Sequence, residues 1–514
     1  MSGSFGDSPM ETVALQMSTQ VKPPRIDSHQ AVPLVDALQR HLDTGAIAFS
    51  TPGHKGGRLL DDQVRGLLGD SVFRSDVWLN TTELDTALRA AEQLAATTWG
   101  ADDARYVVNG SSSGNHALLL ALLNPGDTVI VARDAHMSVL TGLILVGANP
   151  VFVAPELHPT HAMSIGANPA RIAEALDAHP DASLVIVTSP TYHGVASDLP
   201  GIVAAAHAHN VPVMVDEAWG AHFPFHQSLP MHAMAAGADA AVVSLHKTLP
   251  ALSQGAMIVL QGERIDRRRI TASVRMTQST SRCLPILASL DAARRQVALH
   301  GWGLLELTMA LAAWARKELR AIPGLALIDH AALGLPADQV DPTRLVIDTA
   351  GIGLSGYKVE ALLREEFGIA PEMSDRRGIV CVVTVGDTRA SLAALVAALT
   401  AISRRTPVFE SRPRRLAARS VGDAISPGEM TMTPRDAFFA KSHAVPLPTA
   451  IGCIAAEPII PYPPGIPVLV PGERIGWSKL LYLAQVVAGG ATCAGAADPR
   501  LLTIRVVDEE SLQS

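Results

Sequence analysis

The 514-residue sequence predicts an α/β protein built on a mostly parallel sheet. Between residues 100 and 260, short apolar runs alternate with segments of helical apolar spacing, which is the pattern of strand–helix–strand units. Several of these apolar runs are followed directly by polar residues. Because ligands of parallel α/β sheets bind beyond the carboxyl ends of the strands, we expect the functional site along that edge.

The composition limits the class of protein. Hydrophobic residues make up 48% of the chain and charged residues 18%, so a chain of this length can form more than one domain around a large core. The formal net charge of −8 argues against nucleic acid as the main partner, which needs a basic surface. The N-terminus lacks a signal-peptide pattern and no run of about 18 apolar residues occurs, so we expect neither secretion nor a membrane partner.

The cysteines are far apart and form neither a metal-binding pair nor a disulfide pattern. We therefore expect no metal site and a reducing, cytoplasmic environment. The four positions are Cys283, Cys381, Cys453 and Cys493.

Changes in composition predict six segments along the chain. Residues 1–28 are polar, and residues 404–430 are basic and interrupted by Pro, Ser and Gly, so we predict a disordered tail and a linker. The arginines of the linker would suit a polyanion, but a solvated linker is the favoured interpretation. The folded segments are a helix with a glycine-rich loop (29–65), a large sheet domain (66–315), a small α+β domain (316–403) and a C-terminal domain (431–514).

The glycine-rich loop at residues 51–57 (TPGHKGG) follows a segment with helical apolar spacing at residues 33–42. The loop carries two possible cations, His54 and Lys55. Glycines let backbone amides approach a ligand closely. The loop is therefore either a ligand-binding loop or an ordinary surface turn, and both interpretations stay open.

A serine-rich turn is predicted at residues 109–115 (NGSSSGN), between a short strand and a buried helix over residues 116–123. The free amides and the dipole of a helix N-terminus favour an anion, so the turn is a candidate phosphate site. The alternative is that the serines only cap the helix. The three serines are Ser111, Ser112 and Ser113.

Three further apolar runs are predicted strands that end in polar clusters. They cover residues 128–132, 183–188 and 211–215, and a helix over residues 84–99 precedes them. His136 follows the first of these strands, and Asp216 and Trp219 follow the third. Singly, Asp216 would be an ordinary turn acid and His136 a core histidine. In a parallel sheet, however, both would converge with Lys247.

Lys247 lies in the sequence SLHK (244–247), between apolar runs at residues 240–243 and 257–260. A lysine beside buried strands loses hydration, so its neutral form, which makes Schiff bases, becomes accessible near neutral pH. The neighbouring Ser244 and His246 are candidates to bind a phosphate. For such a lysine on its own, a solvated strand end is the alternative.

These groups together suit a pyridine aldehyde phosphate. A Schiff-base lysine would bind the aldehyde, and Asp216 would hold the pyridinium proton, which makes the ring an electron sink. His136 would stack on the face of the ring. The serine-rich turn would then hold the phosphate.

The second half of the chain predicts a small α+β domain and a proline-rich segment. The prolines at residues 461–467 make that segment rigid enough to form a wall of an active site. Glu457, just before it, is either a carboxylate for a cationic substrate or a surface acid. The predicted strands and helices of the small domain are 344–348, 378–384, 359–364 and 394–399.

Several motifs resemble those of the Orn/Lys/Arg decarboxylase family of pyridoxal-phosphate enzymes. They are TPGHKGG (51–57), NGSSSGN (109–115), DEAWGAH (216–222), SLHK (244–247) and two C-terminal segments at 432–441 and 456–469. The resemblance spans about residues 30 to 500 and concerns the short form of the family. It implies fold type I of pyridoxal-phosphate enzymes, as in aspartate aminotransferase, with a seven-stranded sheet domain, a small domain and a C-terminal decarboxylase domain.

The resemblance also implies roles for individual residues. Lys247 would carry pyridoxal phosphate, Asp216 would bind the pyridine nitrogen and His136 would stack on the ring. Trp219 would approach the 3′ oxygen, and residues 278–281 resemble a segment that reaches the cofactor of a neighbouring subunit, which implies a homodimer. The phosphate would be held by Ser111, Ser112, Ser113, Ser244 and His246.

We therefore predict a cytoplasmic, pyridoxal-phosphate-dependent α-decarboxylase of arginine, lysine or ornithine, which yields carbon dioxide and agmatine or a diamine for polyamine biosynthesis. Candidate substrate residues are Glu457, His54 and Lys55. The alternatives are another reaction on the same cofactor, a non-basic substrate, or a silent regulatory homologue. Met137, where many members carry Lys, and a shortened segment at residues 80–85 leave the substrate side open.

Overall fold

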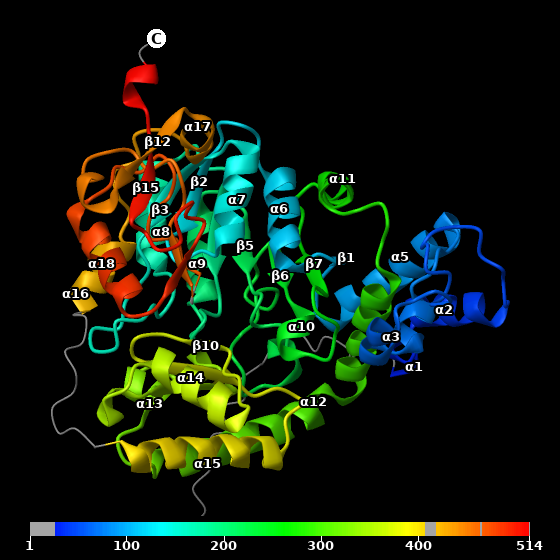
Figure 1. Cartoon of the computed structure of the whole chain (residues 1–514). Helices are drawn as coiled ribbons and strands as arrows, with labels where there is room; N and C mark the ends of the chain where they lie inside the picture. The colour runs from blue at the N-terminus through cyan, green and yellow to red at the C-terminus, as the bar shows by residue number, and fades with distance from the viewer. Residues whose placement is uncertain (1–25, 407–417, 463–464, 513–514) are drawn as a thin grey trace, which may run out of the picture.

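The computed structural model describes residues 26–406, 418–462 and 465–512. The predicted tail up to residue 25 and the middle of the predicted linker lie outside the described residues. The linker arginines Arg412, Arg414 and Arg415 are among those outside them. Figure 1 shows the chain as a large sheet-centred part, a smaller part below it, and a group of N-terminal helices on one flank.

The centre of the molecule is a seven-stranded sheet with the order β1-β7-β6-β5-β4-β2-β3. Strands β2 to β6 run parallel to one another, whereas β7 is antiparallel to both β6 and β1. The predicted α/β class with a mostly parallel sheet is confirmed, while the antiparallel β7 was not predicted. The strands β1 to β7 are Asp103–Val107, Thr128–Ala132, Asn149–Val153, Leu184–Thr188, Val213–Asp216, Ala240–Val243 and Ala256–Leu260.

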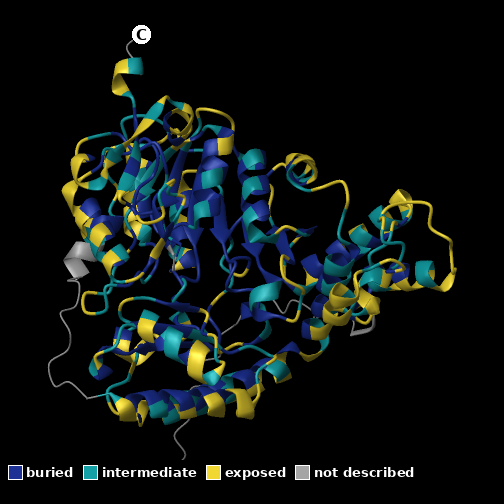
Figure 2. Cartoon of the chain, viewed as in Figure 1, coloured by how far each residue is buried: buried dark blue, intermediate teal, exposed yellow. Residues whose placement is uncertain are grey.

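Helices cover both faces of this sheet and form two cores. One core contains the buried sides of α6 (Gly110–Leu122), α7 (Met137–Val146) and α11 (Arg267–Thr277). The other contains those of α5, α8, α9 and the first part of α12. Because both faces are covered, the strands β4 to β7 are buried at every position and read as continuous apolar runs (Figure 2). The helices α5, α8, α9 and α12 are Thr81–Thr98, Pro169–Ala178, Leu199–Ala208 and Leu284–Arg320.

The serine-rich segment is the first turn of α6, so the predicted turn before a helix at residue 116 was wrong. The helix begins at Gly110, directly after the end of β1. A Cβ atom on Gly114 would lie 2.9 Å from Cγ1 of Val242, so the glycine lets α6 pack closely on β6. This close approach brings the serines to the end of β6, where the sequence SLHK begins.

Helix α12 joins the large domain to the small domain. Its first half contributes Leu287 and Leu290 to the sheet core, and its last turns contribute Ala315 and Leu319 to the core of the small domain. Among the described residues, α12 is long and apolar enough to span a membrane by length and composition alone. Its inward face nevertheless lines two cores, as a core helix does.

The small domain is a four-stranded antiparallel sheet with the order β10-β11-β9-β8, packed on α12, α14 (Gly356–Phe367) and α15 (Arg389–Arg405). Strand β9 (Arg344–Asp348) lies in its middle. The predicted strands and helices of this region are all present. The other strands, β8, β10 and β11, are Ala326–Leu327, Met373–Ser374 and Gly378–Val382.

The C-terminal domain packs against α7 through α17 (Pro434–Phe439). It contains two antiparallel strand pairs, β12 with β15 and β13 with β14, and its own apolar core. Helix α18 (Trp477–Ala488) lies against that core. The remaining elements α16, β12, β13, β14 and β15 are Ala418–Ile425, Ser442–Pro446, Ile460–Tyr462, Thr492–Ala494 and Thr503–Val507.

Four short helices precede the large domain and lie with α5 on one flank of the molecule (Figure 1). The glycine-rich loop lies between the second and third of them. Several apolar side chains of this segment are exposed, among them Phe49 and Leu59 at 94% and 95% exposure. The helices α1 to α4 are Ile26–His29, Pro33–Asp43, Asp62–Leu68 and Asp70–Ser75.

Candidate active site

Asp216 is the last residue of β5, and in the strand register it lies between Thr188 on β4 and Val242 on β6. Its side chain is buried. The Nδ2 group of Asn115 donates a hydrogen bond to Oδ2 at 2.8 Å, and the backbone N–H of Ala218 donates one to Oδ1 at 3.2 Å. These two donors hold the carboxylate in one orientation at the carboxyl edge of the sheet.

His136 follows β2 and forms the N-cap of α7. Its Nδ1 atom accepts a hydrogen bond from the backbone N–H of Ser138 at 3.2 Å and lies 2.8 Å from the hydroxyl of the same residue. Burial lowers the pKa of His136, the charge of Asp216 opposes this shift, and Lys247 adds to it. The three groups therefore lie in one electrostatic environment, as the convergence of the strand ends predicts.

Lys247 lies on α10 (Leu245–Thr248), a single helical turn directly after β6. Burial lowers the pKa of its amine, and the negative charge of Asp216 only partly offsets that effect. The Nζ atom lies 4.3 Å from the centre of the Trp219 ring. A lowered pKa makes the neutral, nucleophilic form of an amine more accessible, and the Schiff-base role of Lys247 stays a prediction.

Arg344, on β9 of the small domain, was not predicted as a site residue. Its guanidinium carbon lies 4.1 Å from the centre of the Trp219 ring, and its charge lowers the pKa of Lys247. The side chain is buried and ion-paired with Asp341 at 3.5 Å, but its Nε and both Nη groups have no hydrogen-bond partner among the described residues. Buried guanidinium groups normally bind carboxylates or phosphates, so these N–H groups suit an anionic ligand.

Asp341 holds Arg344 and His222 together. The carboxylate lies 3.3 Å from Nε2 of His222. Burial alone would raise the pKa of Asp341. The interactions with His222 and Arg344 lower it by more than burial raises it, so the pKa lies well below its usual value. The charged carboxylate therefore anchors the small-domain arginine against the large-domain segment that carries Trp219.

The phosphate site predicted at the serines has two unsatisfied hydroxyls. The Oγ atoms of Ser113 and Ser244 are buried and make no hydrogen bond within the part of the chain that the structure describes. They lie at the N-terminal turn of α6 and at the end of β6, respectively. Unpaired buried hydroxyls at a helix N-terminus fit a phosphate group. His246, in contrast, already contacts the backbone carbonyl of Gly255 at 2.9 Å.

Comparisons with known proteins place this site in a family. Residues 32–391 match the major domain of the Orn/Lys/Arg decarboxylases, and residues 421–496 match their C-terminal domain. The chain belongs to the Orn/Lys/Arg decarboxylase family. The predicted family and the predicted class of enzyme, a decarboxylase of basic amino acids, are confirmed.

Relatives cover almost the whole of this decarboxylase. An arginine decarboxylase from Halalkalibacterium halodurans is 36% identical over 489 residues, which are 93% of this chain and 98% of that protein. An arginine decarboxylase from Bacillus subtilis is 36% identical over 490 residues, which are 94% of this chain and 99% of that protein. Lysine decarboxylase A from Pseudomonas aeruginosa has the same fold, with a TM-score of 0.81 at 23% identity over 93% of this chain and 80% of that chain.

Three predicted substrate residues of the decarboxylase already have hydrogen-bond partners within the chain. Both carboxylate oxygens of Glu457 accept backbone N–H groups, from Arg505 at 2.8 Å and from Ala497 at 2.6 Å. In the glycine-rich loop, Nε2 of His54 lies 3.2 Å from Asp76, and the amine of Lys55 donates to a backbone carbonyl of the same loop. Their roles toward a substrate stay predictions.

Glu372, directly before β10, is a second small-domain residue that the sequence did not single out. Burial raises the pKa of its carboxyl, and the positive charges of Arg344 and Lys247 oppose this shift. Both Arg344 and Glu372 flank apolar strand residues. A charged residue at the edge of an apolar run was therefore the only sequence signal that could have found them.

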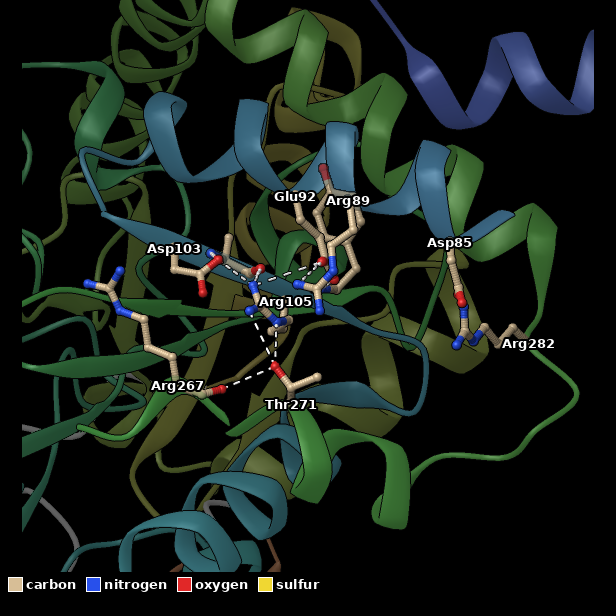
Figure 3. Close-up of polar contacts among 10 residues, drawn as sticks. Asp85, Arg89, Glu92, Asp103, Arg105, Arg267, Thr271 and Arg282 are labelled. Carbon is tan, nitrogen blue, oxygen red and sulfur yellow. Dashed lines mark hydrogen bonds and ion pairs between the residues drawn. The ribbon is translucent and has the colours of Figure 1, made fainter. Parts of the chain in front are cut away.

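A separate cleft of 430 Å³ opens between α5, β1 and α11 of the decarboxylase. Figure 3 shows Glu92 of α5 and Arg105 of β1 pointing toward each other beside it, with Arg105 3.4 Å from the hydroxyl of Thr271. Burial raises the pKa of Glu92 to about 7, although Arg105 opposes the shift. Gln278, which also lines the cleft, accepts a hydrogen bond from the backbone N–H of Val108, just before the start of α6.

Proposed function

We propose that this chain is a pyridoxal-phosphate-dependent arginine decarboxylase, which converts arginine to agmatine and carbon dioxide. The observation that carries the proposal is the cluster of Lys247, Asp216 and His136 at one edge of the sheet, within a chain of the Orn/Lys/Arg decarboxylase family. The choice of arginine rests on the arginine decarboxylases that match this chain at 36% identity over nearly their full length.

The residues present fit pyridoxal phosphate. Lys247 would carry the aldehyde, Asp216 would face the pyridine nitrogen and the ring of His136 would lie over the cofactor ring. The unsatisfied hydroxyls of Ser113 and Ser244 would bind the phosphate. When bound, this cofactor is an electron sink that accepts the electron pair left by a departing carboxylate.

The side chains around the cofactor position the substrate and move protons. The lowered pKa of Lys247 makes the neutral form of its amine more accessible than that of an exposed lysine, which would help the amine to exchange protons during the reaction. The free N–H groups of Arg344 would bind the α-carboxylate of the substrate and orient the bond that breaks. The carboxyl of Glu372, whose pKa responds to both Arg344 and Lys247, would add negative charge beside a cationic substrate.

We propose further that the active unit is a cytoplasmic homodimer. Exposed apolar side chains gather around the glycine-rich loop, including Ile47, Phe49, Leu59 and Leu67. Such a concentration of exposed apolar side chains is typical of a subunit interface. The cysteines are free thiols, which suits a reducing compartment.

The experiment that tests the proposed activity measures carbon dioxide release by the cofactor-loaded protein. The substrates are arginine, lysine, ornithine and a panel of non-basic amino acids. We expect release from arginine, loss of release in Lys247→Ala, and a higher KM for arginine in Arg344→Met. Release from a non-basic amino acid alone, or no release although the cofactor absorbance is present, would overturn the proposal.

A further inference from the structure

A chain of hydrogen bonds joins the two predicted cofactor contacts, His136 and Asp216. It runs through two buried residues of different helices, Ser138 on α7 and Asn115 on α6. The Nδ2 group of Asn115 lies 2.8 Å from Oδ2 of Asp216 and 2.9 Å from the hydroxyl of Ser138. The Ser138 hydroxyl in turn lies 2.8 Å from Nδ1 of His136. Neither Asn115 nor Ser138 has a role in the prediction from the sequence.

The direction of each hydrogen bond in this chain follows from counting protons. A side-chain amide has two N–H protons on Nδ2. Asn115 donates one of them to the carboxylate of Asp216 and the other to the Ser138 hydroxyl. The reverse orientation of the amide would place its carbonyl oxygen against a carboxylate oxygen, with no proton between them, so it is excluded for an ionised Asp216.

Nδ1 of His136 accepts two hydrogen bonds, both from Ser138. Because the Ser138 hydroxyl accepts from Asn115, its single proton is free to be donated to Nδ1 of His136. The backbone N–H of Ser138 donates to the same nitrogen at 3.2 Å. A ring nitrogen that accepts two hydrogen bonds carries no proton, so the proton of His136 is on Nε2. The lowering of the His136 pKa by burial agrees with a neutral ring.

We propose that Asn115 and Ser138 are positioning residues that set the proton of His136 on Nε2 and orient Asp216 at the same time. This inference rests on the proposed function, because it assigns His136 and Asp216 to the cofactor. Asn115 donates hydrogen bonds toward both ends of this series. Its amide therefore fixes the orientation of the Asp216 carboxylate and, through Ser138, the tautomer of the His136 imidazole. A neutral His136 places no second positive charge beside Lys247, so His136 and Lys247 do not repel each other.

Two variants break the chain at different points. Ser138→Ala removes the hydroxyl that donates to Nδ1, and it leaves only the backbone N–H at 3.2 Å, so protonation of His136 becomes easier. Asn115→Asp has the same shape but no N–H donor, and it adds a carboxyl beside Asp216. Ser138→Thr keeps the hydroxyl and serves as the conservative rescue. Thr141→Val, one turn along α7, removes a hydroxyl that contacts only the carbonyl of Met137, and it is the matched control.

The test is a pH titration of the visible absorbance of the bound cofactor, which reports the protonation of its link to Lys247 and requires no turnover. A positive charge on His136 makes protonation of that link harder, so Ser138→Ala should lower the midpoint pH, by about one unit. The added carboxyl of Asn115→Asp should raise the midpoint. Ser138→Thr and Thr141→Val should keep the wild-type midpoint. We also expect roughly tenfold weaker binding of pyridoxal phosphate to apoprotein in the two disruptive variants.

The outcomes separate this inference from the proposed function. A wild-type protein that binds the cofactor but whose midpoint is the same in Ser138→Ala, Asn115→Asp and Thr141→Val overturns the inference and leaves the proposed function standing. A wild-type protein without cofactor absorbance overturns both. Circular dichroism shows whether each variant is folded, and if Ser138→Ala does not fold, Asn115→Asp decides the inference alone.

Discussion

Burial shifts the pKa values of the ionisable side chains of this decarboxylase in opposite directions, depending on whether the charged form is a cation or an anion. It lowers the pKa of Lys247 and His136, because their charged forms are cations that lose hydration. It raises the pKa of Glu92, whose charged form is an anion. The same physical effect therefore favours the neutral amine of Lys247 and the protonated carboxyl of Glu92, whose polar contacts are drawn in Figure 3.

Glu92 gives the decarboxylase a pH-dependent contribution to stability. Its ordinary pKa is 4.5 and its pKa in the folded chain is about 7. Below pH 4.5 the carboxyl is protonated in both states, whereas between these values only the unfolded chain releases the proton, so stability falls as pH rises. Relative to Glu92→Gln, the folded protein should lose roughly 3 kcal/mol by pH 8. Unfolding of both proteins at pH 5, 6.5 and 8 measures this difference, and a constant difference would contradict it.

Helix α7 connects the C-terminal domain to the site. Its N-cap is His136, and its last carbonyls, those of Ile144 and Leu145, accept hydrogen bonds from Arg435 of α17 at 2.9 and 2.7 Å. A cation at a helix C-terminus also interacts favourably with the helix dipole. The C-terminal domain thus holds one end of the helix whose other end carries the imidazole.

A buried ionic cluster also joins the C-terminal domain to the large domain, near the N-terminal end of α7. Arg133, just after β2, lies 3.3 Å from the carboxylate of Glu473 in the C-terminal domain. Lys479 donates to the other oxygen of that carboxylate. Burial and the charge of Arg133 lower the pKa of Lys479 to about 8, although Glu473 opposes the shift. Glu473 is therefore the shared counter-charge of two buried cations, Arg133 from the large domain and Lys479 from the C-terminal domain.

Removing that carboxylate should destabilise the protein strongly. Glu473→Gln leaves Arg133 buried without a counter-charge, which typically costs about 3–5 kcal/mol. The matched control is Glu429→Gln, because Glu429 forms an exposed ion pair with Arg474 at 3.7 Å, and such pairs contribute about 0–1 kcal/mol. Urea unfolding compares the two variants. Equal losses of stability would show that the buried cluster does not hold the domains together.

The whole molecule exposes its apolar side chains unevenly. Many of the exposed apolar side chains lie at and around the glycine-rich loop, on the N-terminal flank. Two helices of this flank, α3 and α4, have no buried residue. The cleft beside Glu92 and Arg105 contains residues of α5 and of the segment after α11. Residues 278–281, which the family resemblance assigns to a neighbouring subunit's cofactor, include lining residues of this cleft.

A homodimer that uses this flank should dissociate when a charge is placed in it. Leu59→Asp introduces a carboxylate at a side chain that is 95% exposed in the single chain, so the fold should be unchanged while a buried interface would be disrupted. Light scattering should give twice 54.0 kDa for the wild type and a smaller mass for the variant, with a parallel loss of carbon dioxide release.

The control for the interface is an exposed apolar side chain far along the chain. Leu502→Asp, at a position that is 64% exposed in the C-terminal domain, should leave both the mass and the activity unchanged. A Leu59→Asp protein that keeps the mass and the activity of the wild type would place the interface elsewhere.

Local sequence patterns were sufficient to predict the parallel sheet and the residues at its carboxyl edge. Buried strands are recognised in a sequence as short apolar runs, which are local patterns. Three such runs lead into Asp216 and into the segments with His136 and Lys247. The family motifs added the cofactor and the class of reaction. Local patterns were less exact at boundaries: the serine-rich segment proved to be part of α6, because Gly114 lets that helix pack against β6.

The partners that complete the candidate site could be identified only in the folded chain. Arg344 comes from another domain and reaches Trp219 through the packing of β9 against the large domain. The link from His136 to Asp216 requires α6 and α7 to lie side by side, so that Asn115 contacts residues of two other elements. Such contacts join residues far apart in the chain, and their hydrogen bonds depend on distances that no local sequence pattern encodes.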